Sequence, residues 1–174
     1  MKKLLLVIDY QYDFVAGSLG FPKAKDLEEI IYKKIESYQK QGDEIIFTLD
    51  THREDYMQTV EGRNLPIKHC LQDSSGRQLY GRIKEFENAG LCFEKETFPS
   101  LDLANYLKGR EYEHVELCGL VSNICVLANA VMVKAALPNT EIIVDAKATA
   151  SFDEHLHEEC LDIMAGLHIK VLNR

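Results

Sequence analysis

The sequence contains no tryptophan and only four prolines, and none of its apolar runs is long enough to cross a membrane. The first such run, Leu4–Ile8, ends at the charged Asp9 and is too short for the apolar core of a secretory signal. Basic residues are outnumbered, because 20 Lys and Arg stand against 28 Asp and Glu. The net charge of -8 argues against binding to nucleic acid through phosphate neutralisation. We therefore expect a cytoplasmic protein that binds neither nucleic acid nor a membrane.

The cysteines lack the pattern of a disulfide-stabilised or zinc-knuckle protein. There are five of them, an odd number, and no two are spaced as C-x-x-C. In a reducing compartment each is by default a small buried apolar residue, so a reactive cysteine needs a specific reason in its surroundings. The five are Cys70, Cys92, Cys118, Cys125 and Cys160.

The 174 residues, 46% of them hydrophobic, are enough to bury one core but too few for two full domains. We therefore expect a single domain over residues 1–174. Short aliphatic and β-branched runs alternate with longer amphipathic stretches, and there is no internal repeat or linker. The expected strands are Lys3–Asp9, Glu44–Asp50, Leu91–Lys95, His114–Leu120, Glu141–Asp145 and His168–Leu172. The expected helices are Asp26–Gln41, Gln78–Asn88, Leu101–Lys108, Ser122–Leu137 and Asp153–Leu167.

Several helix ends carry recognisable signals. Asp26 with Glu29 has the spacing of a capping box, and Ser100 precedes another helix as an N-cap. Gly42 and Gly166 are natural helix stops.

Continuously apolar strands that alternate with helices predict an α/β protein. Both faces of such a sheet are covered, because each right-handed crossover packs its helix onto the sheet. We therefore expect a doubly wound, mostly parallel six-stranded sheet with helices on both faces, a Rossmann-like three-layer sandwich. In such sheets ligands bind beyond the carboxyl ends of the strands where the strand order reverses, commonly between the first and fourth strands.

Three residues expected at that edge have the chemistry of a thiol hydrolase. Asp9 and Lys95 end the first and third strands, and Cys125 follows the fourth at the start of a helix. A thiol pKa of about 8.5 falls beside a cation or at a helix N-terminus, and both are expected for Cys125. Asp9 would accept the thiol proton. Polar residues often follow strands without any function, so the argument depends on all three occurring together.

A second group, at the end of the second strand, suggests a metal site. Asp50 and His52 are two residues apart on an extended segment and can face the same way, and a loop can bring in His69. Two imidazoles and a carboxylate suit zinc, iron or manganese, with Glu61 as a further candidate ligand. The alternative is an aspartate that hydrogen-bonds a nearby loop and two unrelated surface histidines.

These residues lie in segments that together resemble the isochorismatase-like cysteine hydrolases, and within them the nicotinamidase-like branch. The matching segments, which span nearly the whole chain, are Ile8–Phe14, Thr48–His52, Pro66–Cys70, Phe93–Ser100 and Gly119–Val126. The resemblance implies that Asp9, Lys95 and Cys125 form the catalytic triad. It places the metal ligands at Asp50, His52 and His69.

The resemblance also implies further features of the site. These are a cis peptide between Leu120 and Val121, an oxyanion hole formed by the N–H groups of Val121 and Cys125, and substrate contacts from Phe14, Gln11 and Leu120. Phe14 would otherwise be a core residue. Members of the family often form homo-oligomers, so a homo-oligomer is expected here.

The implied reaction is hydrolysis of a small carboxamide to a carboxylic acid and ammonia through a thioester on the cysteine, with nicotinamide as the first substrate to consider. The sequence departs from the nicotinamidase-like branch in its loop Gly62–Pro66, which lacks the tryptophan commonly found there. An N-carbamoyl compound or another small amide is therefore an alternative substrate. A binding module without catalysis is a third reading, which the complete triad disfavours.

Overall fold

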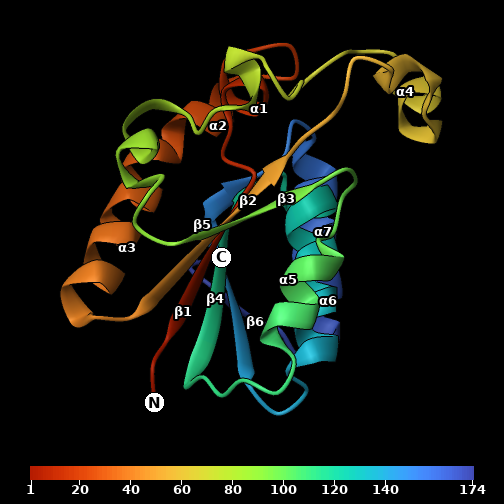
Figure 1. Ribbon diagram of the computed structural model, residues 1–174. Helices are drawn as coiled ribbons and strands as arrows, with labels where there is room; N and C mark the ends of the chain where they lie inside the picture. Colours follow the sequence, from red (N-terminus) through yellow and green to blue (C-terminus); the bar gives the residue numbers. More distant parts are fainter.

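Six strands form one sheet in the computed structural model, which describes residues 1–174 (Figure 1). The strands are β1 Leu4–Ile8, β2 Glu44–Asp50, β3 Leu91–Lys95, β4 His114–Leu120, β5 Glu141–Ala150 and β6 Lys170–Leu172. Their order is β3-β2-β1-β4-β5-β6 and every neighbouring pair is parallel. The strand order reverses between β1 and β4, which confirms the predicted doubly wound fold and its switch point.

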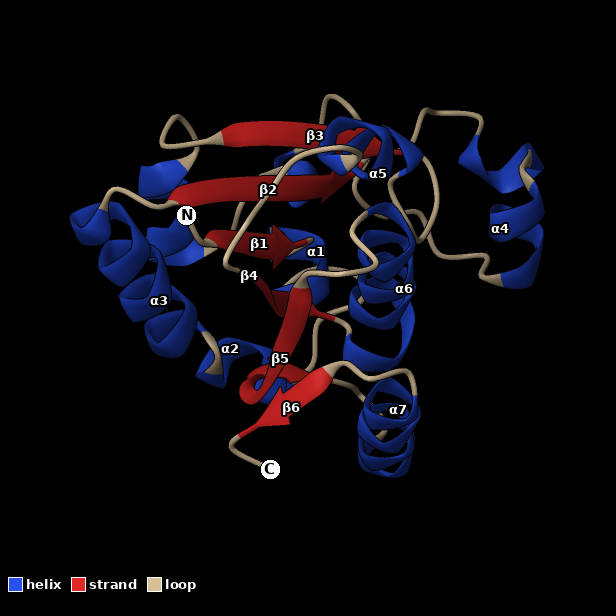
Figure 2. Ribbon diagram, turned by 90° about the horizontal axis from the view of Figure 1, so that it is seen from below, coloured by secondary structure: helices blue, strands red, loops and turns tan.

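Helices cover both faces of the sheet, so the three-layer prediction is also confirmed. The α-helices are α1 Tyr12–Val15, α2 Pro22–Asp26, α3 Glu28–Gln41, α4 Val60–Asn64, α5 Leu101–Leu107, α6 Leu127–Ala136 and α7 Glu154–Gly166. Short 3-10 helices are η1 Tyr56–Gln58, η2 Ser75–Arg77 and η3 Gly81–Phe86, and η4 Ser122–Val126 is a π-helix. Figure 2 shows α2 and α3 on one face, with α6 and α7 on the other.

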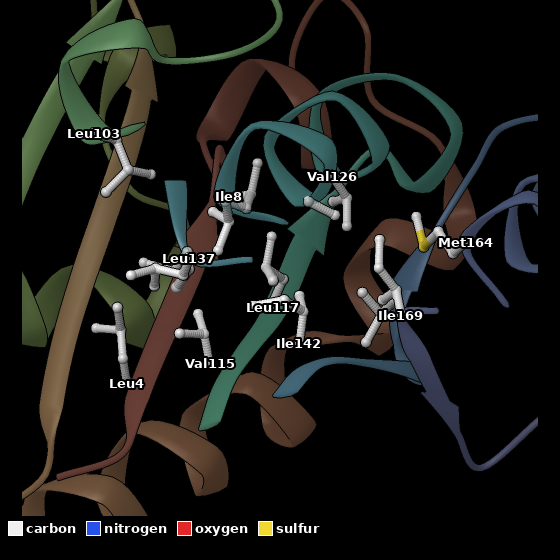
Figure 3. Packing of buried hydrophobic residues seen from close by; sticks show 14 of the residues in the cluster. Leu4, Ile8, Leu103, Val115, Leu117, Val126, Leu137, Ile142, Met164 and Ile169 are labelled. Carbon is white, nitrogen blue, oxygen red and sulfur yellow. The ribbon is translucent and has the colours of Figure 1, made fainter. Parts of the chain in front are cut away.

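Two apolar clusters, one on each face, hold the layers together. Leu4, Leu6 and Ile8 of β1 point into the cluster that includes Leu103 of α5 and Met164 of α7 (Figure 3). The residues between them, Leu5 and Val7, join the cluster beneath α3. Because both faces are buried, β1 is apolar at every position rather than at alternate ones.

Several predictions about the elements were wrong. Of the predicted α-helix Gln78–Asn88, only Gly81–Phe86 is helical, as the 3-10 helix η3. The predicted helix Ser122–Leu137 begins as the π-helix η4 before it continues as α6. Asp26 is the last residue of α2, and α3 begins after Leu27 without a side-chain cap, so the proposed capping box does not exist. Strand β5 continues past Asp145 to Ala150, because pairing with β4 resumes beyond a register shift at Gly119.

Other helix ends follow the sequence signals. Ser100 Oγ accepts a hydrogen bond of 3.1 Å from Leu103 N at the start of α5. Gly42 ends α3 in the left-handed region at φ +73°, where a side chain would be strained. Gly166 is the last residue of α7. None of the helices has the length and apolar character that a bilayer-spanning segment needs.

Candidate active site

The carboxyl edge of the sheet brings the predicted residues together. Asp9 directly follows β1, Asp50 ends β2 and Lys95 ends β3, opposite Asp50 in the strand pairing. Cys125 lies in the π-helix η4, which follows β4. These strand ends flank the switch point between β1 and β4, so the topology concentrates carboxylates, an ammonium and a thiol in one place.

Lys95 lies between the carboxylate and the thiol. Its Nζ is 2.6 Å from Asp9 Oδ2 and 3.7 Å from Cys125 Sγ. Nζ also donates a 2.9 Å hydrogen bond to the carbonyl oxygen of Thr97. All three predicted triad residues are buried, so these charges interact with little screening by water.

Asp9 is held in an unusual backbone conformation. Its φ is +46°, a left-handed value that is uncommon for residues other than glycine and is found at functional sites. Thr48 Oγ1 donates a 2.6 Å hydrogen bond to Asp9 Oδ1. Oδ2 is buried and has no aligned hydrogen bond, although Lys95 Nζ is close to it. This oxygen can therefore accept a proton.

The electrostatics of the three groups keep the resting sulfur protonated. Burial raises the pKa of Asp9, and the nearby charge of Asp50 raises it further. Burial also raises the pKa of the Cys125 thiol well above its usual value, an effect that Lys95 opposes and Asp9 reinforces. The prediction that this thiol has a lowered pKa is therefore wrong for the resting site. Burial favours the neutral form of Lys95, but the neighbouring carboxylates and sulfur outweigh it and raise its pKa, so Lys95 stays charged.

The turn that leads to Cys125 has the predicted cis peptide between Leu120 and Val121. Before it, Gly119 adopts a φ of +111°, and a Cβ at this position would lie 2.0 Å from the carbonyl oxygen of Ile8. A glycine is therefore required where β4 passes β1. The predicted oxyanion donors, the N–H groups of Val121 and Cys125, lie on the turn that follows.

Asp50, His52, Glu61 and His69 form a group that can hold a divalent metal ion. One ligand atom from each lies within 4.8 Å of all the others. Asp50 Oδ2 is 2.8 Å from His52 Nε2 and 3.3 Å from His69 Nε2. Both histidines are buried, so the alternative of two surface histidines is wrong.

The surroundings of Glu61 and His69 also suit a bound cation. Glu61 Oε2 is buried with no hydrogen-bond partner, which is costly unless a cation or water is present. His69 Nδ1 is 2.8 Å from the carbonyl oxygen of Ile67 and donates to it, so Nε2, which faces Asp50, is the nitrogen that would bind a metal after losing its proton. The residues present therefore fit a divalent cation.

Two parts of the chain supply these ligands. Asp50 and His52 extend directly from β2, whereas Glu61 lies on α4, at the end of an arm that projects from the body of the molecule (Figure 1). Thr59 Oγ1 caps α4 by accepting a 2.9 Å hydrogen bond from Gly62 N. The buried ring of Tyr56 packs against both histidines, with ring centres 4.7 Å from His52 and 5.1 Å from His69.

Charge also shapes the metal group. Burial acts to raise the pKa of Asp50, but hydrogen bonds from His52 and His69 and the charge of Lys95 outweigh it and lower the pKa. Asp50 is therefore ionised throughout the physiological range. Burial and the charge of Asp50 raise the pKa of Glu61.

The three predicted substrate-binding residues have different positions. Phe14 is half-buried and packs on His69 with ring centres 5.5 Å apart, so it lies beside the site. Leu120 is fully buried in the core beneath α3, and its side chain has no accessible surface. The amide of Gln11 donates to the carbonyl oxygens of Asp50 and Arg77 and accepts from Asp50 N, each at 2.8 Å. Gln11 therefore braces the end of β2 and the Leu120 side chain belongs to the core, and contact of either residue with substrate stays a prediction.

Two polar cavities open at this edge, one of about 520 Å³ beside Lys95 and one of about 440 Å³ beside His52 and Glu61. Both are lined by Arg53 and Glu96, whose side chains approach to 3.5 Å. The surroundings of the site are thus accessible to small polar molecules.

Comparison with known proteins agrees with this arrangement. The family model of the isochorismatase domain matches residues 3–173. The chain belongs to this family. A nicotinamidase/pyrazinamidase PncA of Bacillus subtilis is 30% identical with a TM-score of 0.89, over 99% of this chain and all of that one. The predicted assignment to the isochorismatase-like hydrolases and their nicotinamidase-like branch is confirmed, and with it the class of enzyme, a hydrolase of non-peptide C–N bonds.

Two further structures share the fold. An N-carbamoylsarcosine amidase of Thermoplasma acidophilum is 25% identical, with a TM-score of 0.80 over 99% of this chain and 96% of that one. A pyrazinamidase of Pyrococcus horikoshii in complex with zinc is 24% identical, with a TM-score of 0.85 over the full length of both chains.

Sequence reasoning did not identify several residues that support the site in this family member. Thr48 donates a hydrogen bond to Asp9, and the only feature of the sequence that could indicate this role is the presence of a polar residue within a mostly apolar strand. Asp13 Oδ2 accepts a 2.7 Å hydrogen bond from Cys70 N and so fixes the loop that carries His69. Gly76 packs so closely against this carboxylate that a Cβ would lie 2.0 Å from Oδ2, a contact that no local pattern reveals.

Proposed function

We propose that this protein hydrolyses a small carboxamide to a carboxylic acid and ammonia, and that nicotinamide is its substrate. The observation that carries the proposal is the position of Lys95 Nζ, 2.6 Å from the Asp9 carboxylate and 3.7 Å from the Cys125 sulfur. The Bacillus subtilis relative named as a nicotinamidase/pyrazinamidase supports the choice of substrate.

Acylation begins with a proton transfer. Because the thiol pKa is raised, Asp9 takes the proton of Cys125 as the sulfur attacks the amide carbon and forms the C–S bond. The N–H groups of Val121 and Cys125 stabilise the resulting oxyanion, and Lys95 remains charged throughout. Asp9 then protonates the departing nitrogen, the C–N bond breaks, and ammonia leaves a thioester on Cys125.

Deacylation uses the same carboxylate. Asp9 accepts a proton from an attacking water, whose oxygen forms a bond to the thioester carbon. The C–S bond then breaks, Asp9 returns its proton to the sulfur, and the carboxylic acid departs. The raised pKa of Asp9 suits both directions of transfer, because a base that must also act as an acid works best near the operating pH.

Asp50, His52, His69 and Glu61 would hold the metal ion, and we propose zinc, with iron or manganese as alternatives. When bound, the ion supplies a Lewis-acidic position that can bind and orient a substrate heteroatom or lower the pKa of a bound water. The zinc complex of the Pyrococcus horikoshii pyrazinamidase supports zinc. Phe14, which packs on His69, would form part of the wall next to the substrate.

An N-carbamoyl compound is the second candidate substrate. The loop before His69 has no tryptophan to stack on an aromatic ring, and the chain shares its fold with an N-carbamoylsarcosine amidase. The same triad can cleave the C–N bond of either substrate, so the shape and chemistry of the substrate pocket determine which of the two is hydrolysed.

Ammonia release from a small panel tests the proposal. We expect release from nicotinamide and pyrazinamide, weaker release from a carbamoyl amine and an aliphatic amide, and none from the Cys125→Ala variant. Cys92→Ala, which alters an exposed cysteine on β3, is the matched control and should retain full activity. If only the carbamoyl amine is hydrolysed, nicotinamide is rejected as the substrate in favour of an N-carbamoyl compound. Full activity of Cys125→Ala would reject catalysis by the thiol.

We further propose that residues 1–174 act as one domain in a cytoplasmic homo-oligomer. The five cysteines are all unpaired, which suits a reducing compartment. Light scattering during gel filtration measures the mass of the particle in solution. A mass equal to that of the monomer at the concentration used in the assay would reject the homo-oligomer.

A further inference from the structure

A buried asparagine connects the nucleophile to the loop that follows Lys95. Asn129 of α6 is 1% exposed, and its Nδ2 donates hydrogen bonds of 2.8 Å to the carbonyl oxygen of Cys125 and 3.1 Å to that of Phe98. Its Oδ1 accepts a 3.0 Å hydrogen bond from Ser100 N. One side chain therefore bonds to the backbone of the nucleophile and twice to residues 98–100.

The loop held in this way also fixes Lys95. The ammonium of Lys95 donates to the carbonyl oxygen of Thr97, which is the residue before Phe98. Few other contacts hold this stretch in place, because Glu96, Thr97 and Phe98 are all exposed. Asn129 thus connects the backbone that carries Cys125 to the loop that binds the Lys95 ammonium. The strength of the interaction between Lys95 Nζ and Cys125 Sγ depends on their separation, which is 3.7 Å.

We propose that Asn129 is a positioning residue that sets the distance between Lys95 and Cys125, an inference that rests on the proposed amidohydrolase function. An apolar side chain cannot replace Asn129, because the Phe98 carbonyl and the buried backbone groups of Cys125 and Ser100 would each lose this hydrogen bond. A displacement of about 1 Å at a catalytic group can lower a rate about 100-fold, so a small relaxation of the loop would be measurable.

Two substitutions and one matched control test the proposal. Asn129→Ala removes all three hydrogen bonds. Asn129→Ser restores one of them, because a serine hydroxyl in a helix can donate to the carbonyl oxygen four residues earlier, here that of Cys125. Ser100→Ala removes the hydroxyl that caps α5 but leaves the backbone N–H that binds Asn129, so it weakens the same region without releasing the connection.

Two readouts separate positioning from general destabilisation. The first is kcat and KM for ammonia release, and the second is the rate at which iodoacetamide alkylates Cys125 at one pH, followed by mass spectrometry of its peptide. For Asn129→Ala we expect kcat to fall about 10- to 100-fold with KM changed less than about threefold, and alkylation to slow about 10-fold. We expect Asn129→Ser to be intermediate and Ser100→Ala to match the wild type in both readouts.

The proposal is overturned if Asn129→Ala alkylates as fast as the wild type or faster, or if Ser100→Ala loses as much activity as Asn129→Ala. If Asn129→Ala does not fold, Asn129→Ser decides, and wild-type rates in that variant reject the role. Alkylation needs no substrate, so it tests the positioning even if the wild type releases no ammonia, an outcome that would reject the proposed function alone.

Discussion

Lys95 Nζ lies 3.4 Å from Oδ1 of Asp50, whose other oxygen is 2.8 Å from His52 Nε2. One carboxylate therefore touches both the predicted triad and the predicted metal group. Because Asp50 is buried and ionised, its charge acts on Cys125 as well as on a bound cation. The two groups form one electrostatic unit, so substitutions in one should be detectable in the other.

Asp50→Asn and Glu61→Gln should differ in this respect. Both remove a proposed metal ligand, and we expect each to weaken metal binding at least about 10-fold, measured by elemental analysis after dialysis at a fixed metal concentration. In protein stripped of metal, only Asp50→Asn should speed the alkylation of Cys125, because the charge of Asp50 raises the pKa of that thiol. His155→Ala, which alters an exposed histidine on α7, is the control for metal content. Equal metal in all four proteins would contradict the site.

The decline of kcat/KM at acid pH, called here the acid limb, should follow protonation of Asp9. In the proposed mechanism catalysis requires the Asp9 carboxylate, whose pKa is raised by burial, so kcat/KM should begin to fall at a pH above the ordinary 3.8. Thr48→Val removes the hydroxyl that donates to Asp9 Oδ1 and should move this limb to still higher pH. Thr149→Val is the matched control, since the buried hydroxyl of Thr149 has no partner. An acid limb that is unchanged in Thr48→Val would show that another group controls it.

Gly119→Ala should destabilise the protein strongly. The new methyl group would collide with the carbonyl oxygen of Ile8, and the φ of +111° would be strained. We expect a loss of about 3 kcal/mol in the free energy of unfolding, measured by urea denaturation. Gly42→Ala is the control, because Gly42 also has positive φ but its Cβ position has open space. It should cost only about 1–2 kcal/mol, and a Gly119→Ala variant no less stable than Gly42→Ala would refute the steric argument.

His157 should make the protein less stable in mild acid. This histidine of α7 is buried, lies 2.9 Å from Ser122 Oγ through its Nδ1, and has its pKa lowered by burial. The unfolded chain takes up a proton near pH 6.5 while the native state resists it, so stability should decline as the pH falls below that value. His157→Gln should lose less stability than the wild type between pH 7.5 and 5.5. His155→Gln, at an exposed position, should behave like the wild type, and equal slopes in all three proteins would argue against this role.

The strands and the switch point were predictable because their signals are local. A fully apolar run such as Leu4–Ile8 is buried on both faces only in a covered sheet, and the alternation with helices fixes its parallel neighbours. Asp9, Asp50 and Lys95 are predictable because each directly follows or ends a strand recognisable from the sequence, although β3, which Lys95 ends, is largely exposed. Their common edge follows from the topology.

Long-range contacts explain what the sequence did not reveal. The sequence predicts a lowered pKa for the Cys125 thiol, but burial and the nearby carboxylates outweigh Lys95 and raise that pKa, and neither effect is visible in the spacing of the residues. The closeness of Gln11 to Asp9 in sequence suggests a substrate contact, but spacing does not reveal that its amide hydrogen-bonds the backbone of β2, 39 positions away. The segment Gly81–Phe86 has helical periodicity but forms only a 3-10 helix beneath α3.

The separate origins of the ligands have a consequence for how such a protein can diverge. Asp50 and His52 are tied to the register of the sheet, whereas Glu61 is delivered by a peripheral arm with its own cap at Thr59. Insertions or exchanges within residues 55–66 can therefore change the fourth donor while Cys125 keeps its place. Because Asp50, and not Glu61, contacts Lys95, this short excursion of the chain is the natural target for altering ion preference without altering bond cleavage.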